Sequence, residues 1–399
     1  MEAWIPLGYL ISAALFIFGL KKLGHPRTAP RGNQYGAMGM LVAVITTVVD
    51  MQLAAGGMNW ELIVAGLVVG SVIGMIMAIK VEMTGMPELV ALFNGFGGAA
   101  SALVALAETW KYIEDPTIAL PTGLTLQVVV VAAGLSALVG WMTLTGSILA
   151  MFKLKGGVNF FGKWIRTPTW GPAWLNPVKV LLTVTVLALI VMSINDPTNT
   201  DYLWAIIGIS CLLGIVLVLP IGGADMPVVV SLLNSLSGIA AAFTGFIISN
   251  PVLIVAGSLV GASGLILTFI MCKAMNRTLP DVLFKSFGGS TKETVTRTKV
   301  GSDPDEVAMM VDGAQKVIIV PGYGMAVSQC QHQVKEFGDL LEEKFGTEVK
   351  YAIHPVAGRM PGHMNVLLAE ANVPYEQLIE MDEINPEFPE CDVAVVIGA

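Results

Sequence analysis

The sequence predicts a polytopic α-helical membrane bundle of nine spans, followed by a smaller α/β domain built on a parallel sheet. Of its 399 residues, 54% are hydrophobic and only 13% are charged, whereas soluble globular chains carry roughly 25% charged residues. Nine stretches have the ~20 mostly apolar residues that a spanning helix needs. After Pro280, charged and apolar residues alternate as in a soluble domain.

The apolar stretches all lie before residue 273. The predicted spans are Trp4–Leu20, Gly36–Ala55, Trp60–Ile79, Glu88–Ala107, Leu124–Met151, Val178–Ile194, Tyr202–Leu219, Val228–Ser249 and Val252–Cys272. The first stretch has no basic residues before it, and its basic cluster follows it. That order favours a first transmembrane helix over a signal peptide.

Basic residues predict the orientation of these spans. With the N-terminus outside, twelve lysines and arginines fall on the inner side, and one, Lys111, falls outside. Cytoplasmic loops are enriched in Lys and Arg. We therefore expect residues 1–275 to form the membrane domain and everything after the ninth span to be cytoplasmic.

Residues 276–312 are rich in Gly, Ser, Thr, Lys and Asp without periodicity, and are predicted to be a linker. In residues 313–399, short β-branched runs alternate with helical patterns, which favours a parallel α/β sheet. The predicted strands are Lys316–Val320, Val349–Ile353 and Val393–Ile397, and the predicted helices cover 326–345 and 364–371. The last strand stops where a ligand-binding loop would begin, so we expect the domain to be incomplete at its C-terminus.

A glycine-rich turn follows the first predicted strand. It reads Gly322-Tyr-Gly-Met-Ala-Val327 and directly precedes a helix. In this context small residues let the backbone approach a pyrophosphate, and the helix N-terminus offers N–H groups and a positive dipole end. A valine replaces the third glycine, so a tight turn without a ligand is the alternative. The context favours dinucleotide binding in a Rossmann-like domain.

The second predicted strand leads into a loop, His354 to Asn365, with two prolines, two glycines, two histidines and Arg359. Arg359 could pair with phosphate in a bidentate way, or the loop could be a surface loop with an incidental arginine. The acidic run Glu380–Glu383 is predicted to be a solvated loop.

Polar and small residues form stripes on the fourth, fifth and eighth spans. Most fit close helix packing, but the amides of Asn94 and Asn234 need partners, so they line a proton path or bond across helices. Asp225 could cap the eighth helix or contact the soluble domain. No histidine lies in a predicted span, so a proton relay needs Asn, Ser and water, or a titratable group from another chain.

Some classes of function are disfavoured. The net charge of −8 includes no basic patch, so no nucleic-acid partner is expected. The four cysteines lack CxxC spacing, which indicates neither a disulfide framework nor a metal site.

Several long segments resemble the β subunit of the proton-translocating (Re/Si-specific) NAD(P) transhydrogenase, and the likeness covers the whole chain. They are Asp225–Ser235, Ile270–Arg277, Val320–Val327, Ile353–Ala371 and Glu380–Asn385. The resemblance implies hydride transfer between NADH, held by a partner α subunit, and NADP⁺, held by this subunit, coupled to proton translocation and producing NADPH. It also implies a dimer of αβ units in the bacterial inner membrane, with a periplasmic N-terminus.

The resemblance also assigns residues. NADP(H) would be held by Gly322, Tyr323, Gly324, Met325, Ala326, Val327, His354, Val356, Ala357, Gly358 and Arg359, and the proton path and its coupling would use Asn94, Ser147, Asn234 and Asp225. Many family members have a histidine in place of Asn94, so here the titrating group is expected on the partner. The family's loop after the last strand and its 2′-phosphate segment do not follow Ala399, so weak or no NADP(H) binding is expected.

Two other classes of protein would share these features. A secondary transporter with a nucleotide-sensing cytoplasmic domain needs the same spans and the same glycine turn, but would show substrate-sized broken helices. A non-enzymatic membrane scaffold leaves the glycine turn and the Arg359 loop without a purpose.

Overall fold

The computed structural model describes residues 4–25, 27–55, 59–81, 85–115, 118, 120, 123–160, 163–165, 170–284, 303–358, 360 and 362–398. The chain divides into two compact units. The first comprises Met1–Gly223 and Val228–Thr268, and the second comprises Ala224–Pro227 and Phe269–Ala399.

Within the described residues, nine helices are long and apolar enough to cross a membrane, which confirms the predicted spans. They are α1 (Trp4–Leu23), α2 (Ala29–Ala55), α3 (Trp60–Lys80), α4 (Met86–Glu114), α5 (Leu126–Leu154), α6 (Leu175–Asn195), α7 (Thr200–Val218), α8 (Met226–Ile247) and α9 (Pro251–Ala274). Helix α2 begins before the predicted Gly36. Pro30 lies in its first turn, where the missing N–H has no helical acceptor to lose.

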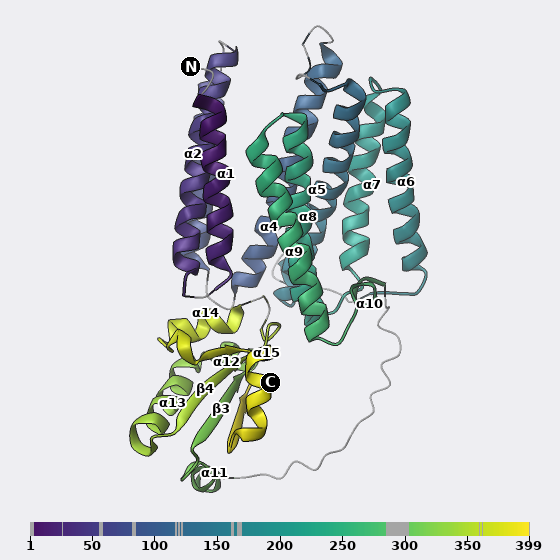
Figure 1. Cartoon of the computed structure of the whole chain (residues 1–399). Helices are drawn as coiled ribbons and strands as arrows, with labels where there is room; N and C mark the ends of the chain where they lie inside the picture. The colour runs from purple at the N-terminus through teal and green to yellow at the C-terminus, as the bar shows by residue number, and fades with distance from the viewer. Residues whose placement is uncertain are drawn as a thin grey trace. The chain divides into compact units, whose positions relative to one another are not determined.

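Small residues let the helices of the first unit pack closely, as the stripes predict. A Cβ atom on Gly140 of α5 would lie 2.4 Å from the carbonyl oxygen of Gly98 on α4. Similarly, a Cβ atom on Gly238 of α8 would lie 2.9 Å from the carbonyl oxygen of Gly257 on α9. The backbones of these pairs are therefore in contact, and α4, α5, α8 and α9 lie side by side in the ribbon view (Figure 1).

Helices α1 and α2 form an antiparallel hairpin (Figure 1). The Ser12 hydroxyl donates to the Gly39 carbonyl at 2.7 Å, and the Tyr9 hydroxyl lies 3.2 Å from Oδ2 of Asp50. Helix α3 buries none of its residues against the rest of the described chain, which suits a helix surrounded by apolar groups outside this chain.

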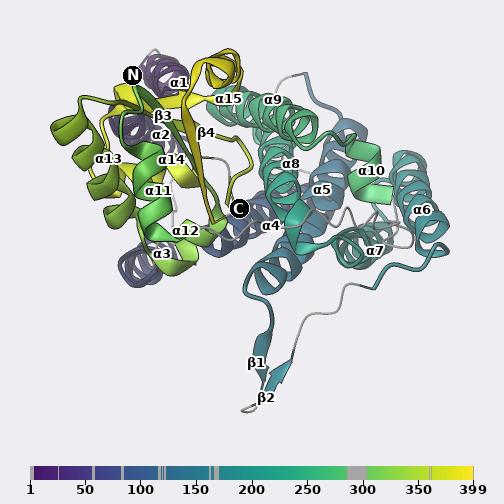
Figure 2. The same ribbon diagram turned by 90° about the horizontal axis from the view of Figure 1, so that it is seen from below.

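A small hairpin that the sequence did not predict follows α5. Strands β1 (Val158–Phe160) and β2 (Lys163–Ile165) pair antiparallel, and Figure 2 shows them projecting from the helices of their unit. Three-residue strands are too short to produce a recognisable alternation of polar and apolar residues.

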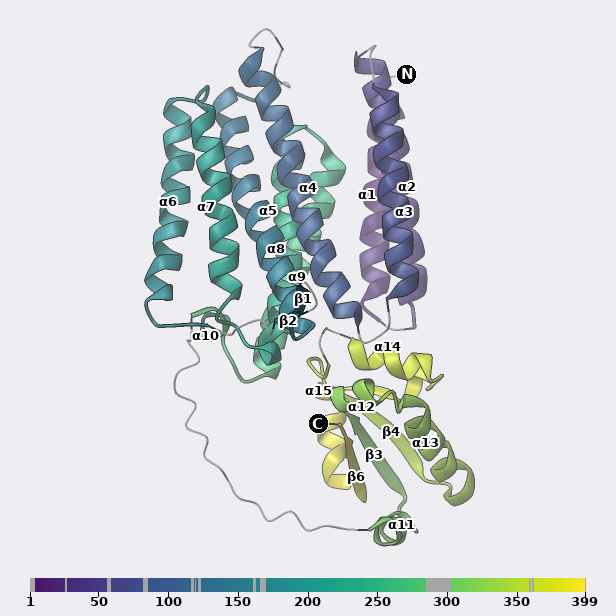
Figure 3. The same cartoon turned by 180° about the vertical axis from the view of Figure 1, so that it is seen from behind.

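The second unit contains the predicted parallel sheet. Its strands are β3 (Lys316–Pro321), β4 (Glu348–Ile353), β5 (Leu378–Glu380) and β6 (Val393–Ile397), in the order β5-β4-β3-β6 with every pairing parallel. Figure 3 shows β4, β3 and β6 next to one another. The central strand β3 is the most buried, and Val317, Ile318 and Ile319 are fully covered.

Two helical predictions in this unit are wrong in detail. The single helix expected over 326–345 is two helices, α12 (Tyr323–Ser328) and α13 (Gln331–Phe345), because Gln329 adopts a left-handed conformation with φ 52°. Gly362 precedes α14 (His363–Glu370) with φ 74°, so this helix starts one residue earlier than predicted.

Short elements also occur where loops were expected. The described part of residues 276–312 contains α10 (Leu279–Phe284) and α11 (Pro304–Val311), and the Asp303 side chain caps α11 by accepting from the Glu306 amide at 2.9 Å. The acidic run Glu380–Glu383 ends β5 and enters α15 (Met381–Ile384). Local capping and edge pairing create these elements, and neither produces periodicity in the sequence.

Candidate functional site

The glycine turn after β3 lies against the end of β6. The Gly322 amide donates to the Ile397 carbonyl at 2.7 Å, and the Gly324 amide donates to the Gly398 carbonyl at 2.7 Å. In the order β5-β4-β3-β6, the chain proceeds from β3 outward to β5 and then returns to the other side of β3. The turn therefore occupies the switch point between β3 and β6, at the carboxyl ends of the strands, which is where open α/β sheets bind ligands.

Glycine is required on both sides of this contact. A Cβ atom on Gly324 would lie 2.7 Å from the Gly398 Cα atom. Gly398 has φ 69°, and its Cβ atom would lie 2.3 Å from the Met325 nitrogen. Real side chains do not fit at such distances, so the two glycines allow the turn to approach the end of β6 directly.

The structure refines the expected roles of the turn. The amides of Gly322 and Gly324 are bonded to Ile397 at the end of β6 and to Gly398 directly after it, so they are not the free N–H groups that the sequence suggested. Met325 and Ala326 are fully buried, whereas Val327 is 60% exposed. Val327 replaces the third glycine of the motif without obstructing the packing of helix on sheet, because its side chain points outward.

The second predicted loop folds close to the same edge. After β4, the His354 Nδ1 atom accepts from the Val356 amide at 3.3 Å, and the Ala357 amide donates to the His354 carbonyl at 3.0 Å. Gly358 has φ 106°, and a Cβ atom there would lie 2.5 Å from Nδ1 of the buried His363. Arg359 lies outside the described residues.

An aromatic contact joins the two motifs. The rings of Tyr323, in the glycine turn, and His363, at the end of the loop, have centroids 6.0 Å apart. Burial lowers the pKa of His354 below its ordinary value of 6.5, so its imidazole is neutral near pH 7. His354 therefore offers this edge a neutral hydrogen-bonding group, and a phosphate would need its positive charge from elsewhere.

In the first unit, three of the predicted polar positions lie where α4, α5 and α8 meet. The Asn94 amide of α4 donates to the Val230 carbonyl of α8 at 3.3 Å. Ser147 of α5 is fully buried, and among the described residues its hydroxyl has no hydrogen-bond partner. Gly95, the residue after Asn94, packs closely against Ser147, since a Cβ atom on Gly95 would lie 2.9 Å from Cβ of Ser147. Asn234 follows Val230 by about one turn of α8 and is half-buried.

A second polar layer ties the same three helices. The Ser136 hydroxyl of α5 lies 2.9 Å from that of Thr244 on α8, and Thr244 donates to the Ser101 carbonyl of α4 at 2.9 Å. These contacts satisfy polar groups within apolar helices, which is the structural alternative considered for the stripes.

Asp225 has a partner that the sequence reasoning missed. It lies in a short 3₁₀ turn (Gly223–Asp225) before α8, is 2% exposed, and accepts from Nη1 of Arg277 at 2.8 Å. Arg277 was counted only as an inner-loop charge, because 52 residues separate it from Asp225. The aspartate is therefore held by an ion pair within the second unit.

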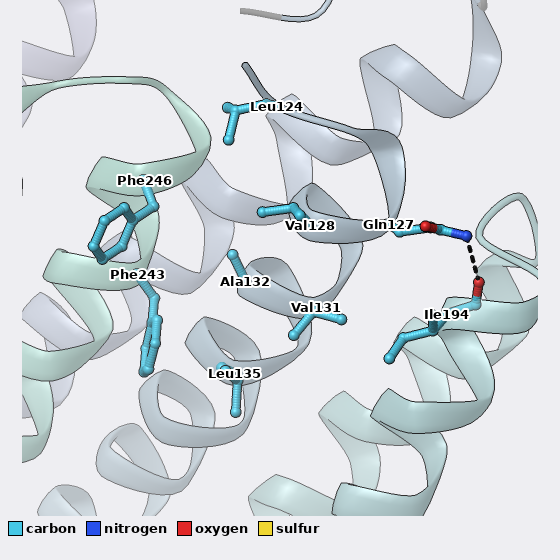
Figure 4. Close-up of a pocket in the computed structure, with 9 residues that line it drawn as sticks. All are labelled: Leu124, Gln127, Val128, Val131, Ala132, Leu135, Ile194, Phe243 and Phe246. Atoms are coloured by element: carbon cyan, nitrogen blue, oxygen red, sulfur yellow. Dashed lines mark hydrogen bonds between the residues drawn. The ribbon is translucent and has the colours of Figure 1, made fainter.

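Two apolar cavities in the first unit are poor sites for a charged ligand. One, of about 420 Å³, is lined by side chains of α5, α6 and α8, including Val128, Phe243 and Phe246, and its one amide, Gln127, already donates to the Ile194 carbonyl at 3.4 Å (Figure 4). The other, of about 370 Å³, is lined by three tryptophans and by aliphatic side chains. Neither lining includes a charged residue.

Comparison with known proteins agrees with this geometry. The family model described as NAD(P) transhydrogenase beta subunit matches residues 5–399. The NAD(P) transhydrogenase subunit beta of Rhodospirillum rubrum, and the same subunit from a named strain of that species, are each 43% identical over 400 residues. The match covers 98% of this chain and 82% of each relative. The chain belongs to the NAD(P) transhydrogenase beta subunit family.

Proposed function

We propose that the C-terminal part of this chain holds NADP(H) while a partner α subunit holds NAD(H), so that hydride passes between them and NADPH is produced. NAD(P) transhydrogenation coupled to proton translocation is the function of the family to which the chain belongs. The observation that carries the assignment of NADP(H) to this chain is the position of the glycine turn at the switch point between β3 and β6.

The backbone arrangement at this edge supports the proposal of a dinucleotide site. Residues 313–399 form a Rossmann-like arrangement, in which a Gly-x-Gly turn links the central strand to a helix. A Cβ atom on Gly324 would collide with Gly398, and one on Gly358 would collide with His363, so both glycines are needed for the close packing of this edge. The nucleotide-holding set is Gly322, Tyr323, Gly324, Met325, Ala326, Val327, His354, Val356, Ala357, Gly358 and Arg359.

Within this set, the residues have different roles. Because His354 is neutral, Arg359 supplies the positive charge for phosphate. Met325 and Ala326 are buried and act by fixing the turn. A bound nicotinamide supplies the hydride chemistry itself, so the chain's own residues bind and orient, and none acts as an acid or base in hydride transfer.

The proton path is proposed to pass between α4, α5 and α8, past Asn94, Ser147 and Asn234, with Asp225 as the coupling carboxylate. Polar groups inside a membrane are costly unless they are paired or hydrated. The buried hydroxyl of Ser147 is bonded to no described residue, and a water molecule would satisfy it. The titrating group is supplied by the partner subunit.

The remaining organisation follows from the same proposal. Residues 1–275 translocate protons, residues 276–312 link the two parts, and residues 313–399 bind the nucleotide. The working form is a dimer of αβ units in the bacterial inner membrane, with the N-terminus periplasmic and the nucleotide part cytoplasmic. The distribution of basic residues supports this orientation.

The test is NADPH binding and coupled transfer by the full chain, purified with its α subunit and reconstituted in lipid vesicles. We expect NADPH to bind in preference to NADH, and to reduce an NAD⁺ analogue with movement of protons. Gly324→Ala should weaken NADPH binding by about tenfold or more, because overpacking typically costs 1–3 kcal/mol. The matched control Gly208→Ala lies on an open face of α7 and should bind as the wild type does.

A complex that binds neither nucleotide and transfers no hydride would exclude this proposal. The runner-up would then be a secondary transporter whose cytoplasmic part senses a nucleotide. Normal NADPH binding by Gly324→Ala would instead show that the switch-point turn is not the binding element.

A further inference from the structure

A lysine near the end of α5 is buried although the sequence counts it among the inner-loop charges. Lys153 is 8% exposed and is the next to last residue of α5 (Leu126–Leu154). It follows Ser147 by six residues, about 9 Å along the helix axis. Among the described residues, it forms no ion pair with a carboxylate.

The Lys153 ammonium group instead binds backbone carbonyls. Its Nζ atom donates to Val218 at 3.0 Å, to Ile221 at 2.7 Å and to Leu219. Val218 is the last residue of α7, and the other two belong to the connector between α7 and α8. Three hydrogen bonds use the full donor capacity of an ammonium group, and the carbonyls at a helix C-terminus favour a positive charge.

The connector between α7 and α8 is also held by packing. Ile221 is 2% exposed and Val218 is fully buried. Helices α5 and α7 also touch through their backbones, because a Cβ atom on Gly214 would lie 2.3 Å from the Met142 carbonyl oxygen. The lysine therefore ties the end of α5 to the connector that follows α7. The first unit contains Lys153, the connector residues it binds, and α8 from Val228 onward.

Other contacts also set how α8 lies against α5. One of them is the Ser136–Thr244 hydrogen bond near the C-terminal end of α8. The Val230 carbonyl that accepts from Asn94 lies between the connector and Thr244 along the chain, and so does Asn234. A shift of α8 along its axis would break the contact between Asn94 and Val230.

Burial of an ammonium group without a carboxylate partner is costly. An exposed lysine could cap a helix C-terminus without that cost. We propose that Lys153 is a positioning residue of the coupled reaction. Its ammonium group holds the α7–α8 connector so that α8 presents the Val230 carbonyl and Asn234 to Asn94 and Ser147. The inference rests on the proposed function, because it needs these residues to line the proton path.

The test uses the full chain with its α subunit in sealed lipid vesicles. Hydride transfer from NADPH to an NAD⁺ analogue and proton movement, followed by a pH-sensitive dye, are measured in the same sample. Their ratio does not depend on how much enzyme has folded. We expect Lys153→Met to lower the ratio by about 2- to 30-fold, since residues on a coupling route change coupling by 0.5–2 kcal/mol.

Two further variants separate positioning from a general loss of structure. Lys153→Arg keeps the charge and several donors, and should recover most of the ratio. Lys153→Gln keeps an amide donor without charge and should lower the ratio, so it decides the question if Lys153→Met does not fold. The matched control is Lys155→Met, because Lys155 is exposed two residues away, and it should keep the wild-type ratio.

The outcomes are distinct. An unchanged ratio in both Lys153→Met and Lys153→Gln, whatever their total activity, would overturn the inference and leave Lys153 a purely structural cap. A ratio for Lys153→Arg that is no higher than the ratio for Lys153→Gln would also overturn the inference. An inactive wild-type complex would remove the proposed function, and the inference with it, whereas an active wild type with unaffected variants removes only the inference.

Discussion

The ring of Tyr323, in the turn after β3, lies 6.0 Å from the ring of His363 at the start of α14, and the two planes are inclined by 48°. Forty residues separate them along the chain, and each belongs to a different motif of the candidate nucleotide site. This contact fixes the glycine turn relative to the loop that follows β4.

Replacing Tyr323 should therefore loosen the site. Aromatic pairs contribute about 0.5–1.5 kcal/mol beyond the burial of their area, so we expect Tyr323→Leu to raise the Kd for NADPH by about 2- to 12-fold. Isothermal titration calorimetry of the complex with its α subunit would measure this. Tyr375→Leu is the control, because Tyr375 is exposed on another turn of the second unit, and an equal effect there would contradict the assignment.

The conformation of Gly358 leads to a second prediction. Gly358→Ala would combine a left-handed backbone with a Cβ atom 2.5 Å from His363 Nδ1, and should weaken NADPH binding and destabilise the fold. Gly362→Ala has a similar backbone requirement, with φ 74° and open space around the added atom. The free energy of unfolding of each variant is measured by urea denaturation, and the difference between the two isolates the clash with His363. Equal losses of unfolding free energy would show that this contact is unimportant.

A third prediction concerns pH. Burial lowers the pKa of His354 in the folded state, so protons bind the unfolded state first as the pH falls. The contribution of His354 to stability is complete above its unfolded pKa of about 6.5 and is lost as the pH falls through the lower folded value. The free energy of unfolding should therefore decrease on acidification from pH 7.5 to 5.5.

Substitution of His354 supplies the control for this pH effect. His354→Asn retains an acceptor for the Val356 amide and should flatten the decrease in the free energy of unfolding over the same pH interval. His332→Asn, at an exposed position on α13, should leave the decrease intact. An identical pH dependence in wild type and His354→Asn would show that another group is responsible.

The ion pair between Asp225 and Arg277 allows a double-mutant cycle. The Asp225 side chain is 3% exposed, whereas that of Arg277 is 45% exposed. Arg277→Gln leaves a buried carboxylate without its cation and should lower the stability, although less than for a fully buried pair, because solvent reaches Arg277. The double variant Asp225→Asn with Arg277→Gln should be less destabilised than Arg277→Gln alone, as measured by thermal unfolding. Strictly additive losses would mean that the pair is not coupled.

Much of the fold could be predicted because it depends on local composition. Each span is a continuous apolar stretch, and β3 and β6 are short β-branched runs, so residues close in sequence carry the signal. The glycine turn was recognisable for the same reason, since strand, glycines and helix follow one another. The split at Gln329 was not predictable, because a left-handed residue between two helical patterns leaves the periodicity almost unchanged.

The candidate sites show the limit of sequence-based prediction. Asn94, Ser147 and the glycine turn could be named from the sequence, but their surroundings could not. Val230, Arg277 and Gly398 each complete a contact with a residue at least 50 positions away. Their role depends on which helices or strands become neighbours.

The sequence by itself determined that this chain crosses a membrane many times and carries a Gly-x-Gly turn on a parallel sheet, because length, apolar content and motif spacing are properties of contiguous residues. Only the tertiary structure decided that the Gly324 amide is bonded to Gly398, directly after β6, and that Lys153, which counted as an inner-loop charge in the sequence, is a buried donor to three carbonyls. The physical reason is that a hydrogen bond is set by the position of its acceptor, and here every acceptor comes from a distant part of the chain.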